Sequence, residues 1–281
     1  KTREKKRGCL MSMLLVSFIS VLCGFLLVGV LAIRAKKSTI EDYLLAGRDI
    51  GPWAIGLSAL ATGQSGFKFI GLIGYTYVTG VSGIWIILGW FLGDLLAWST
   101  KTPEKFRDKA AKLGVMTIPS FLSASGQTQK TPWLQWLSAL IIFVFLSSYA
   151  AAQLASAGKS FQVLLGWPYN TGSYLSAVII LLYCYAGGIR ASIWTDVVQS
   201  IVMLFGMYAL VYCSVGAAGG PVGLFSNLKN IDSSLVHWAP SGVSSFFLFF
   251  LSLVISGFGV LGQPHVMVRS MALNSSDNMT L

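Results

Sequence analysis

Lys68 lies inside an apolar stretch, residues 52–79, that holds no other charged residue. A lysine near the middle of a bilayer costs about 2.5 to 3.5 kcal/mol on insertion scales, so it is retained where a cavity or a partner receives it. The same stretch is interrupted by Thr62-Gly63-Gln64-Ser65-Gly66, which makes a poor helix centre. Broken helices in secondary transporters release backbone carbonyls that coordinate a cation near the midplane. The sequence of residues 62–68 therefore predicts a binding site for an ion and a solute.

Three roles are open for Lys68. It could pair with a carboxylate of a bound solute, or place an ammonium group at the cation site that the helix break predicts. It could instead form an ion pair with Asp94 in the next apolar stretch. The spacing of Lys68 from Ala61 and Gln64 puts the three residues near one helical face, so we favour a role in the cavity.

The chain offers no residues for catalysis or for a transition-metal site. Its four cysteines lack metal-ligand spacing. His237 and His265 lie far apart in the sequence without an acidic cluster, so we expect both to be structural. No nucleophile, base and orienting group can be assembled, and we therefore expect a protein that is not an enzyme.

The elements that must position these residues are membrane helices. The 281-residue chain is 54% hydrophobic and 11% charged, and its mean hydropathy is +0.70, which a soluble domain hardly reaches. A helix that crosses about 30 Å of hydrocarbon needs about 20 apolar residues. Seven stretches are long enough, at 11–33, 52–79, 81–99, 133–157, 172–189, 191–217 and 243–262. We predict an all-α polytopic membrane protein with about seven transmembrane helices.

The net charge of +10 reflects membrane topology and not nucleic-acid binding, because the basic residues cluster in loops without interleaved aromatics. If the loops 34–51 and 100–132 share one side, twelve basic residues face that side and two face the other. The twelve are Arg34, Lys36, Lys37, Arg48, Lys101, Lys105, Arg107, Lys109, Lys112, Lys130, Arg190 and Arg269, and the two are Lys159 and Lys229. The positive-inside rule then predicts a multi-pass protein of the plasma membrane with an external amino terminus.

Residues 1–10 oppose this orientation, because five of the first seven are basic. We interpret residues 1–10 as upstream sequence or a basic tail, and residues 11–281 as a single membrane domain.

Three motifs in order resemble the solute:sodium symporter family, in its sodium/proline symporter branch. They are Tyr43-Leu44-Leu45-Ala46-Gly47-Arg48 before Gly51-Pro52-Trp53, Gly187-Gly188-Ile189-Arg190-Ala191 before Trp194-Thr195-Asp196, and Gly262-Gln263-Pro264-His265. The resemblance implies the leucine-transporter-like fold, in which two five-helix repeats are inverted. It places the first repeat at about 52–217, followed by about one helix of the second. The resemblance further implies that the domain is truncated at its carboxyl end.

The resemblance also assigns site residues. It implies sodium coordination by the backbone carbonyls of Ala61 and Gln64. The positions that correspond to the solute site are Ser65, Gly66, Phe67, Tyr149, Ser256 and Val260, and those expected to act in coupling or gating are Lys68, Asp196 and Arg48. Proline transporters carry an acidic residue where this chain has Gly63, and an apolar residue where it has Lys68.

We therefore expect symport of a small organic solute, such as proline or a related amino or carboxylic acid, by alternating access. Sodium is the expected coupling ion, and the change at Gly63 together with Lys68 leaves proton coupling open. A second class also stays open, because symporter-like membrane domains serve as input domains of sensor histidine kinases. The expected partners are the solute and the lipid bilayer, with no nucleic acid, and the sequence indicates no oligomeric state.

Overall fold

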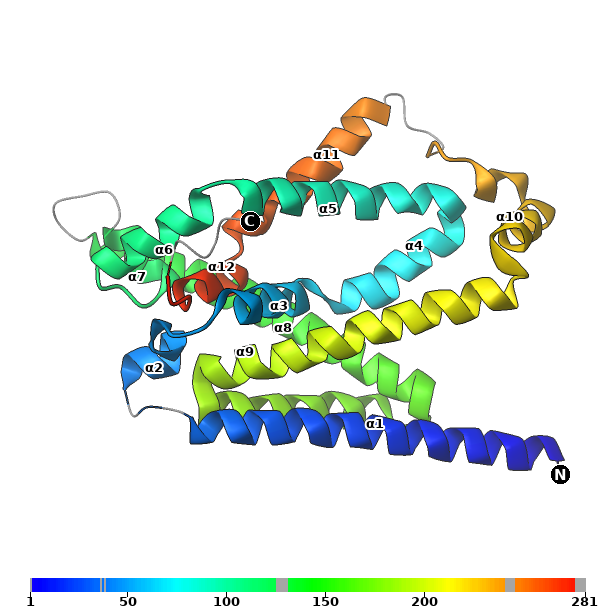
Figure 1. Cartoon of the computed structure of the whole chain (residues 1–281), viewed down its shortest axis with the longest axis horizontal. Helices are drawn as coiled ribbons and strands as arrows, with labels where there is room; N and C mark the ends of the chain where they lie inside the picture. The colour runs from blue at the N-terminus through cyan, green and yellow to red at the C-terminus, as the bar shows by residue number, and fades with distance from the viewer. Residues whose placement is uncertain (1, 36, 38, 125–130, 241–245, 276–281) are drawn as a thin grey trace.

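The computed structural model describes residues 2–35, 37, 39–124, 131–240 and 246–275. These residues form helices joined by short turns, and their only β-type pairing is an isolated bridge between Ile50 and Leu273 (Figure 1). Lys36, Lys130 and the first residues of the predicted span 243–262 lie outside the described residues. The all-α prediction is confirmed for the described part of the chain.

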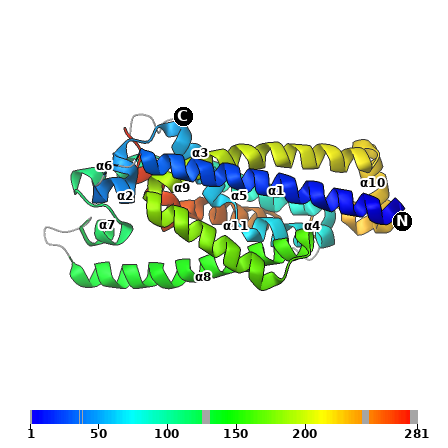
Figure 2. The ribbon, with the colours of Figure 1, turned by 90° about the horizontal axis from the view of Figure 1, so that it is seen from below.

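The first long helix, α1 (Thr2–Arg34), continues through the segment that we interpreted as a tail. It packs against α9 (Tyr169–Ala217) along one side of the molecule (Figures 1 and 2). Arg34 lies in its last turn, where a cation is favoured by the helix dipole.

The predicted break in the second span is confirmed. Helix α3 (Pro52–Gly63) begins with a proline in its first turn, a position that proline favours. It ends at Gly63, because the next residue, Gln64, has an extended backbone with φ of −82° and ψ of 127°. A π-helical turn, η2 (Phe67–Gly71), follows and leads into α4 (Leu72–Thr79). Short π-helical turns are rare and occur often at functional sites.

The chain reverses after α4 and continues into the third span. Gly80 has φ of 63°, which favours glycine, and it begins the turn η3 (Gly80–Gly83) before α5 (Ile84–Ser99). Figure 1 shows α4 and α5 meeting at this turn and diverging from it.

Four short helices gather at one end of the molecule, opposite α10 (Figures 1 and 2). They are α2 (Ile40–Leu45, followed by η1, Ala46–Arg48), α6 (Thr102–Lys112), α7 (Ile118–Ala124) and α12 (Pro264–Met271). The fully buried apolar side chains of the chain are concentrated here, among them Leu45, Ala110, Ile193, Met271 and Leu273. The long helices instead expose apolar side chains, as expected of surfaces that face lipid or other helices.

The fourth, fifth and sixth spans are formed by α8 (Pro132–Leu165) and by α9. Helix α9 is two helices joined at Gly188, where φ of 59° and ψ of −152° interrupt the helical backbone. A Cβ at this position would collide with the backbone carbonyl of Tyr43 in α2. Gly188 therefore permits both the sharp turn and the close approach of α2.

The segment after α9 holds α10 (Gly220–Ile231) and η4 (Ser233–Val236), and η4 packs against η3. The last span begins with α11 (Phe246–Phe258), which packs against α5 at Gly89 and Gly93. Small residues at these positions let the two backbones approach closely. After η5 (Gly259–Gly262) the chain bends by 53° into α12.

By length and hydropathy, four described helices could cross a membrane, or five if the bent pair that ends in α12 is one span. Two of the four are interrupted, since one contains the reversal at Gly80 and another contains the turn at Gly188. When each interrupted helix is counted as two membrane crossings and α3 is included, the number of helices agrees roughly with the seven predicted crossings.

Candidate functional site

The break between α3 and η2 alters the hydrogen bonding of two predicted sodium ligands. The carbonyl of Ala61 accepts from Gln64 N at 3.0 Å, in a tighter turn than an α-helix. Lys68 N donates to Ser65 O at 3.0 Å, so Gln64 O does not receive this regular i+4 bond. A backbone carbonyl that lacks its regular helical donor, as Gln64 O does, is the kind of ligand with which broken membrane helices hold cations.

A cavity of about 410 Å³ lies between this break and α8. Its size falls in the usual range for small-molecule sites. It is lined by Ser65, Gly66, Phe67, Ile70, Gly71, Tyr149, Ala152, Gln153 and Ser156. Four of the six predicted solute positions, Ser65, Gly66, Phe67 and Tyr149, are therefore brought together at one cavity.

Gln153 connects α8 to the break directly. Its Oε1 accepts a hydrogen bond of 2.7 Å from Gly66 N, two residues after the extended Gln64. A Cβ at Gly66 would collide with the side chain of Ser156, so α8 approaches the broken helix closely here. The sequence analysis did not identify Gln153 or Ser156. A signal was present, because Tyr149, Gln153 and Ser156 are polar residues spaced by four and three along one span.

The other predicted solute residues lie elsewhere. Ser256 is exposed on α11 and Val260 lies in η5, and neither lines the cavity. Lys68 is half-buried and also does not line the cavity, whereas Asp94 on α5 is close enough for its charge to act on Lys68. The neighbouring ring of Phe67 lies 6.2 Å from that of Trp90, one turn before Asp94. The proposed roles of Ser256, Val260 and Lys68 stay predictions.

Tyr149 meets a residue of the last span that the sequence analysis took as structural. The ring centroids of Tyr149 and His265 lie 5.4 Å apart. Nδ1 of His265 is buried and has no hydrogen-bond partner among the described residues. The contact joins α8 to the first turn of α12, next to the cavity.

Asp196 takes part in a buried polar network that joins three spans. Its Oδ2 accepts from Ser58 Oγ on α3 at 2.7 Å and from Arg269 Nη2 on α12 at 2.8 Å. Arg269 Nε donates to Ser58 Oγ at 2.7 Å, and Arg269 also donates to the backbone carbonyl of His265. A buried ion pair is weak evidence for stability and better evidence for a specific arrangement. This network therefore indicates that α3, α9 and α12 pack together in one defined arrangement.

Arg48 ties three segments together at the same end of the molecule. From a left-handed backbone with φ of 53°, it donates to Glu41 Oε1 and to Val115 O, each at 2.9 Å, and to Met271 O at 3.4 Å. Ile50 strengthens the connection, because its N–H donates to Ala272 O and its carbonyl accepts from Asn274 N. The segment before α3 and the end of α12 are therefore held side by side.

Asp42 and Arg190 form a buried ion pair beside this connection. Arg190 Nη2 donates to Asp42 Oδ1 at 2.5 Å and to Ala46 O at 2.7 Å. Burial opposes ionisation of Asp42, but the hydrogen bond from Arg190, the bond from Lys37 N and both positive charges hold the pKa of Asp42 below its ordinary value. The pair docks α2 onto the turn at Gly188.

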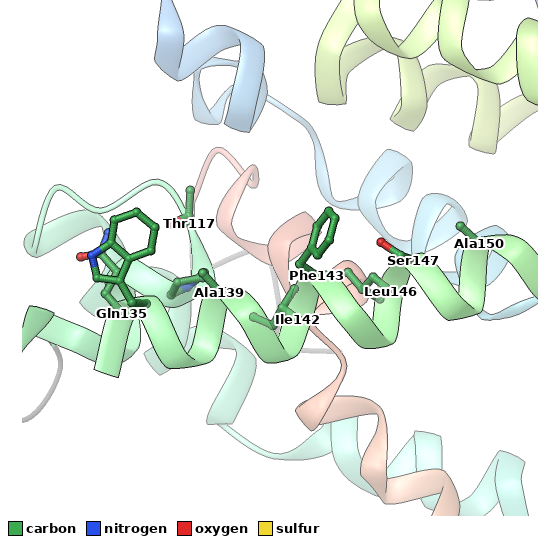
Figure 3. Close-up of a pocket in the computed structure, with 10 residues that line it drawn as sticks. Thr117, Gln135, Ala139, Ile142, Phe143, Leu146, Ser147 and Ala150 are labelled. Atoms are coloured by element: carbon green, nitrogen blue, oxygen red, sulfur yellow. The ribbon is translucent and has the colours of Figure 1, made fainter. Parts of the chain in front are cut away.

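A larger cavity of about 680 Å³ lies along the open face of α8 (Figure 3). Most of its lining comes from one helix and is apolar, including Ile142, Phe143 and Leu146, and its polar groups are Thr117, Gln135 and Ser147. None of the predicted site residues lines it. We assign the site to the smaller cavity, because that cavity adjoins the helix break.

The chain was compared with known proteins. A model of the sodium:solute symporter family matches residues 43–280. The chain is 34% identical over 251 residues to the high-affinity proline transporter PutP of Bacillus subtilis, which covers 89% of this chain and 52% of that protein. It is 31% identical over 267 residues to the sodium/proline symporter of Escherichia coli, covering 93% and 51%. The chain spans about half the length of the curated relatives it matches.

One solved structure is similar in fold. A Na⁺-coupled sialic acid symporter in a substrate-bound outward-open state aligns with a TM-score of 0.74 and 22% identity, over 95% of this chain and 54% of that one. This likeness confirms the predicted transporter fold. The sensor alternative finds no support among the relatives named here.

Proposed function

Because the chain belongs to the sodium:solute symporter family, we propose that it carries the ion- and solute-binding part of a sodium-coupled symporter for a small organic solute. The solute class that we propose is an amino acid such as proline, or a related carboxylic acid, because the relatives at 31–34% identity are named as proline transporters. The first inverted repeat is assigned to residues 52–217, within a single membrane domain at 11–281.

The observation that carries this proposal is the helix break beside the cavity of about 410 Å³. Sodium is assigned to the carbonyls of Ala61 and Gln64, whose regular helical hydrogen bonding is altered at the break. The solute is assigned to the adjoining face formed by Ser65, Gly66, Phe67 and Tyr149. Ion and solute would then share one short segment of chain, which is a direct way to couple their binding.

We assign a gating role to the networks around Asp196 and Arg48. Both connect α12 to other segments at the end of the molecule that carries α2, α6 and α7. Opening a path from the cavity at this end would require the Arg269–Asp196 pair to separate. We place this end on the cytoplasmic side of the plasma membrane, with the amino terminus outside, because most basic loop residues lie here.

Uptake into proteoliposomes tests the proposal. The full-length gene product should accumulate labelled L-proline, or another member of a panel of small amino and carboxylic acids, when an inward sodium gradient is imposed. A potassium gradient of the same size should give background uptake. If no solute in the panel is taken up or bound with either a sodium or a proton gradient, the proposed function is wrong.

Tyr149→Ala sharpens the assignment of the cavity. Removal of the aromatic face and the phenol should raise the apparent solute constant about tenfold or more, with normal amounts of protein in the membrane. Tyr208→Ala is the matched control, because Tyr208 lies on α9 with 73% of its surface exposed. If Tyr149→Ala has the same apparent solute constant as the parent, Tyr149 packs against its neighbours and does not bind the solute.

A further inference from the structure

We infer that Gln153 both holds the helix break in its binding conformation and binds a hydrogen-bond acceptor of the solute, most directly a carboxylate oxygen. The inference rests on the proposed function and names the group of the solute that the cavity recognises. The sequence motifs assigned no role to this residue.

The first role follows from the bond between Gly66 and Gln153. A helix that restarts after a break presents backbone N–H groups without helical partners. Gly66 N is such a donor, and Gln153 Oε1 satisfies it at 2.7 Å from a different helix. Because the bond joins α8 to the restart of the second span, it fixes the position of Ser65 to Phe67 relative to Tyr149 on α8. It also holds the neighbouring carbonyls of the proposed sodium site.

The second role follows from the chemistry of the amide. A glutamine side chain has one acceptor oxygen and one donor nitrogen, and the orientation of an amide has to be assigned from its partners. The Gly66 N–H can only donate, so it must face Oε1. Nε2, with two hydrogens, is then directed away from Gly66. Within the described part of the chain Nε2 has no hydrogen-bond partner, and Gln153 lines the cavity.

The rest of the lining favours an acceptor group on the solute. None of the nine lining residues carries a charge, so a carboxylate would be held here by neutral donors. The hydroxyls of Tyr149 and Ser65 are the other side-chain groups that can donate, since Ser156 Oγ donates to Ala152 O at 3.0 Å. Donor groups of this kind bind a carboxylate by charge-assisted hydrogen bonds, while Phe67 and Tyr149 cover an apolar body.

Two substitutions separate the two roles in the full-length gene product. Gln153→Met keeps the length of the side chain but removes both polar atoms. The apparent constants for sodium and for L-proline should then both rise, the latter about tenfold or more. Gln153→Glu, measured at alkaline pH where a carboxyl there is ionised, keeps an acceptor for Gly66 N but removes the donor. It should raise the proline constant strongly and leave the sodium constant near that of the parent.

The matched control is Gln162→Glu, the same chemical change on the same helix at an exposed residue outside the cavity. It should behave as the parent. A second comparison uses L-prolinamide, which lacks the carboxylate, as a competitor of labelled proline. The parent should prefer proline to prolinamide, and Gln153→Met should lose most of this preference.

Each measurement has a result that would contradict a proposed role of Gln153. Parental proline constants in both variants, with normal thermal stability, would overturn both roles. A proline constant that rises in Gln153→Met and not in Gln153→Glu would overturn solute binding by Nε2. Solute binding by Nε2 would also be overturned if Gln153→Met still preferred proline to prolinamide. If the parent itself binds no solute of the panel, the proposed function fails and not the assignment of Gln153 alone.

Discussion

At the scale of single residues, the end of the molecule with α2, α6, α7 and α12 depends on a few buried charges. Asp42 is fully buried and pairs with Arg190, which also holds the carbonyl of Ala46. Removal of one partner leaves a buried charge without compensation, which typically costs about 3–5 kcal/mol. Exposed ion pairs contribute about 1 kcal/mol or less.

Asp42→Asn should therefore destabilise the detergent-solubilised protein by several kcal/mol, seen as a large fall in the unfolding midpoint. Glu41→Gln is the control, because its pair with Arg48 leaves 47% of the Glu41 side chain exposed, and its midpoint should change little. The pKa of Asp42 is held below its ordinary value, so its contribution is complete at neutral pH. It is lost only as the pH falls through the folded-state pKa. Equal midpoints for the two variants would contradict this account of the pair.

The residues of the site could be predicted in part. Ser65 to Phe67 were predicted because they lie at or next to the break, and Tyr149 because the family resemblance assigns it. Gln153 and His265 were not found, because their roles depend on contacts between spans that are far apart in the chain. The bond of Gln153 to Gly66 crosses 87 positions of sequence, and no local pattern fixes such a contact.

At the scale of elements, breaks position the site and the surrounding helices. The sequence predicted the interruption at 62–66, because glycine and polar residues there make a poor helix centre. It also placed a boundary between two spans near 189–191, and the turn lies at Gly188. The π-helical turn after the first break could not be predicted, because it depends on how η2 packs against its neighbours.

Gly188→Ala tests whether the turn in α9 needs glycine. A side chain there would meet the carbonyl of Tyr43 and would sit in backbone geometry that only glycine adopts readily. We expect a loss of about 1–3 kcal/mol from the backbone alone, measured as a lower unfolding midpoint and less protein in the membrane. Gly206→Ala lies in the same helix with open space around its Cβ and should be neutral or stabilising. The same behaviour in both variants would show that the turn tolerates a side chain.

At the scale of the whole molecule, the two ends differ in charge and in packing. The end with α2, α6, α7 and α12 carries the basic loops and the buried clusters, and the opposite end carries α10 (Figure 1). The membrane class and the transporter fold were predictable, because hydropathy and ordered motifs extend over the chain. The network that joins α3, α9 and α12 was not predictable, because it is formed by three side chains that are far apart in the sequence.

Reporter fusions test the orientation of these ends. A reporter fused after Lys109, on α6, should be cytoplasmic, and one fused after Asn227, on α10, should be external. A reporter that is active on only one side of the membrane should therefore give opposite results at the two sites. Equal results would overturn the assignment of the spans.

The central claim is that an ion and a solute bind together at the break between α3 and η2. The direct measurement is solute binding to the purified full-length gene product as the sodium concentration is varied at constant ionic strength and constant pH. The solute dissociation constant should fall as sodium rises, and by linkage the sodium constant should fall by the same factor as solute rises. Gln153→Met should weaken both constants. Solute affinity that is the same in sodium and in potassium would contradict sodium coupling at this site.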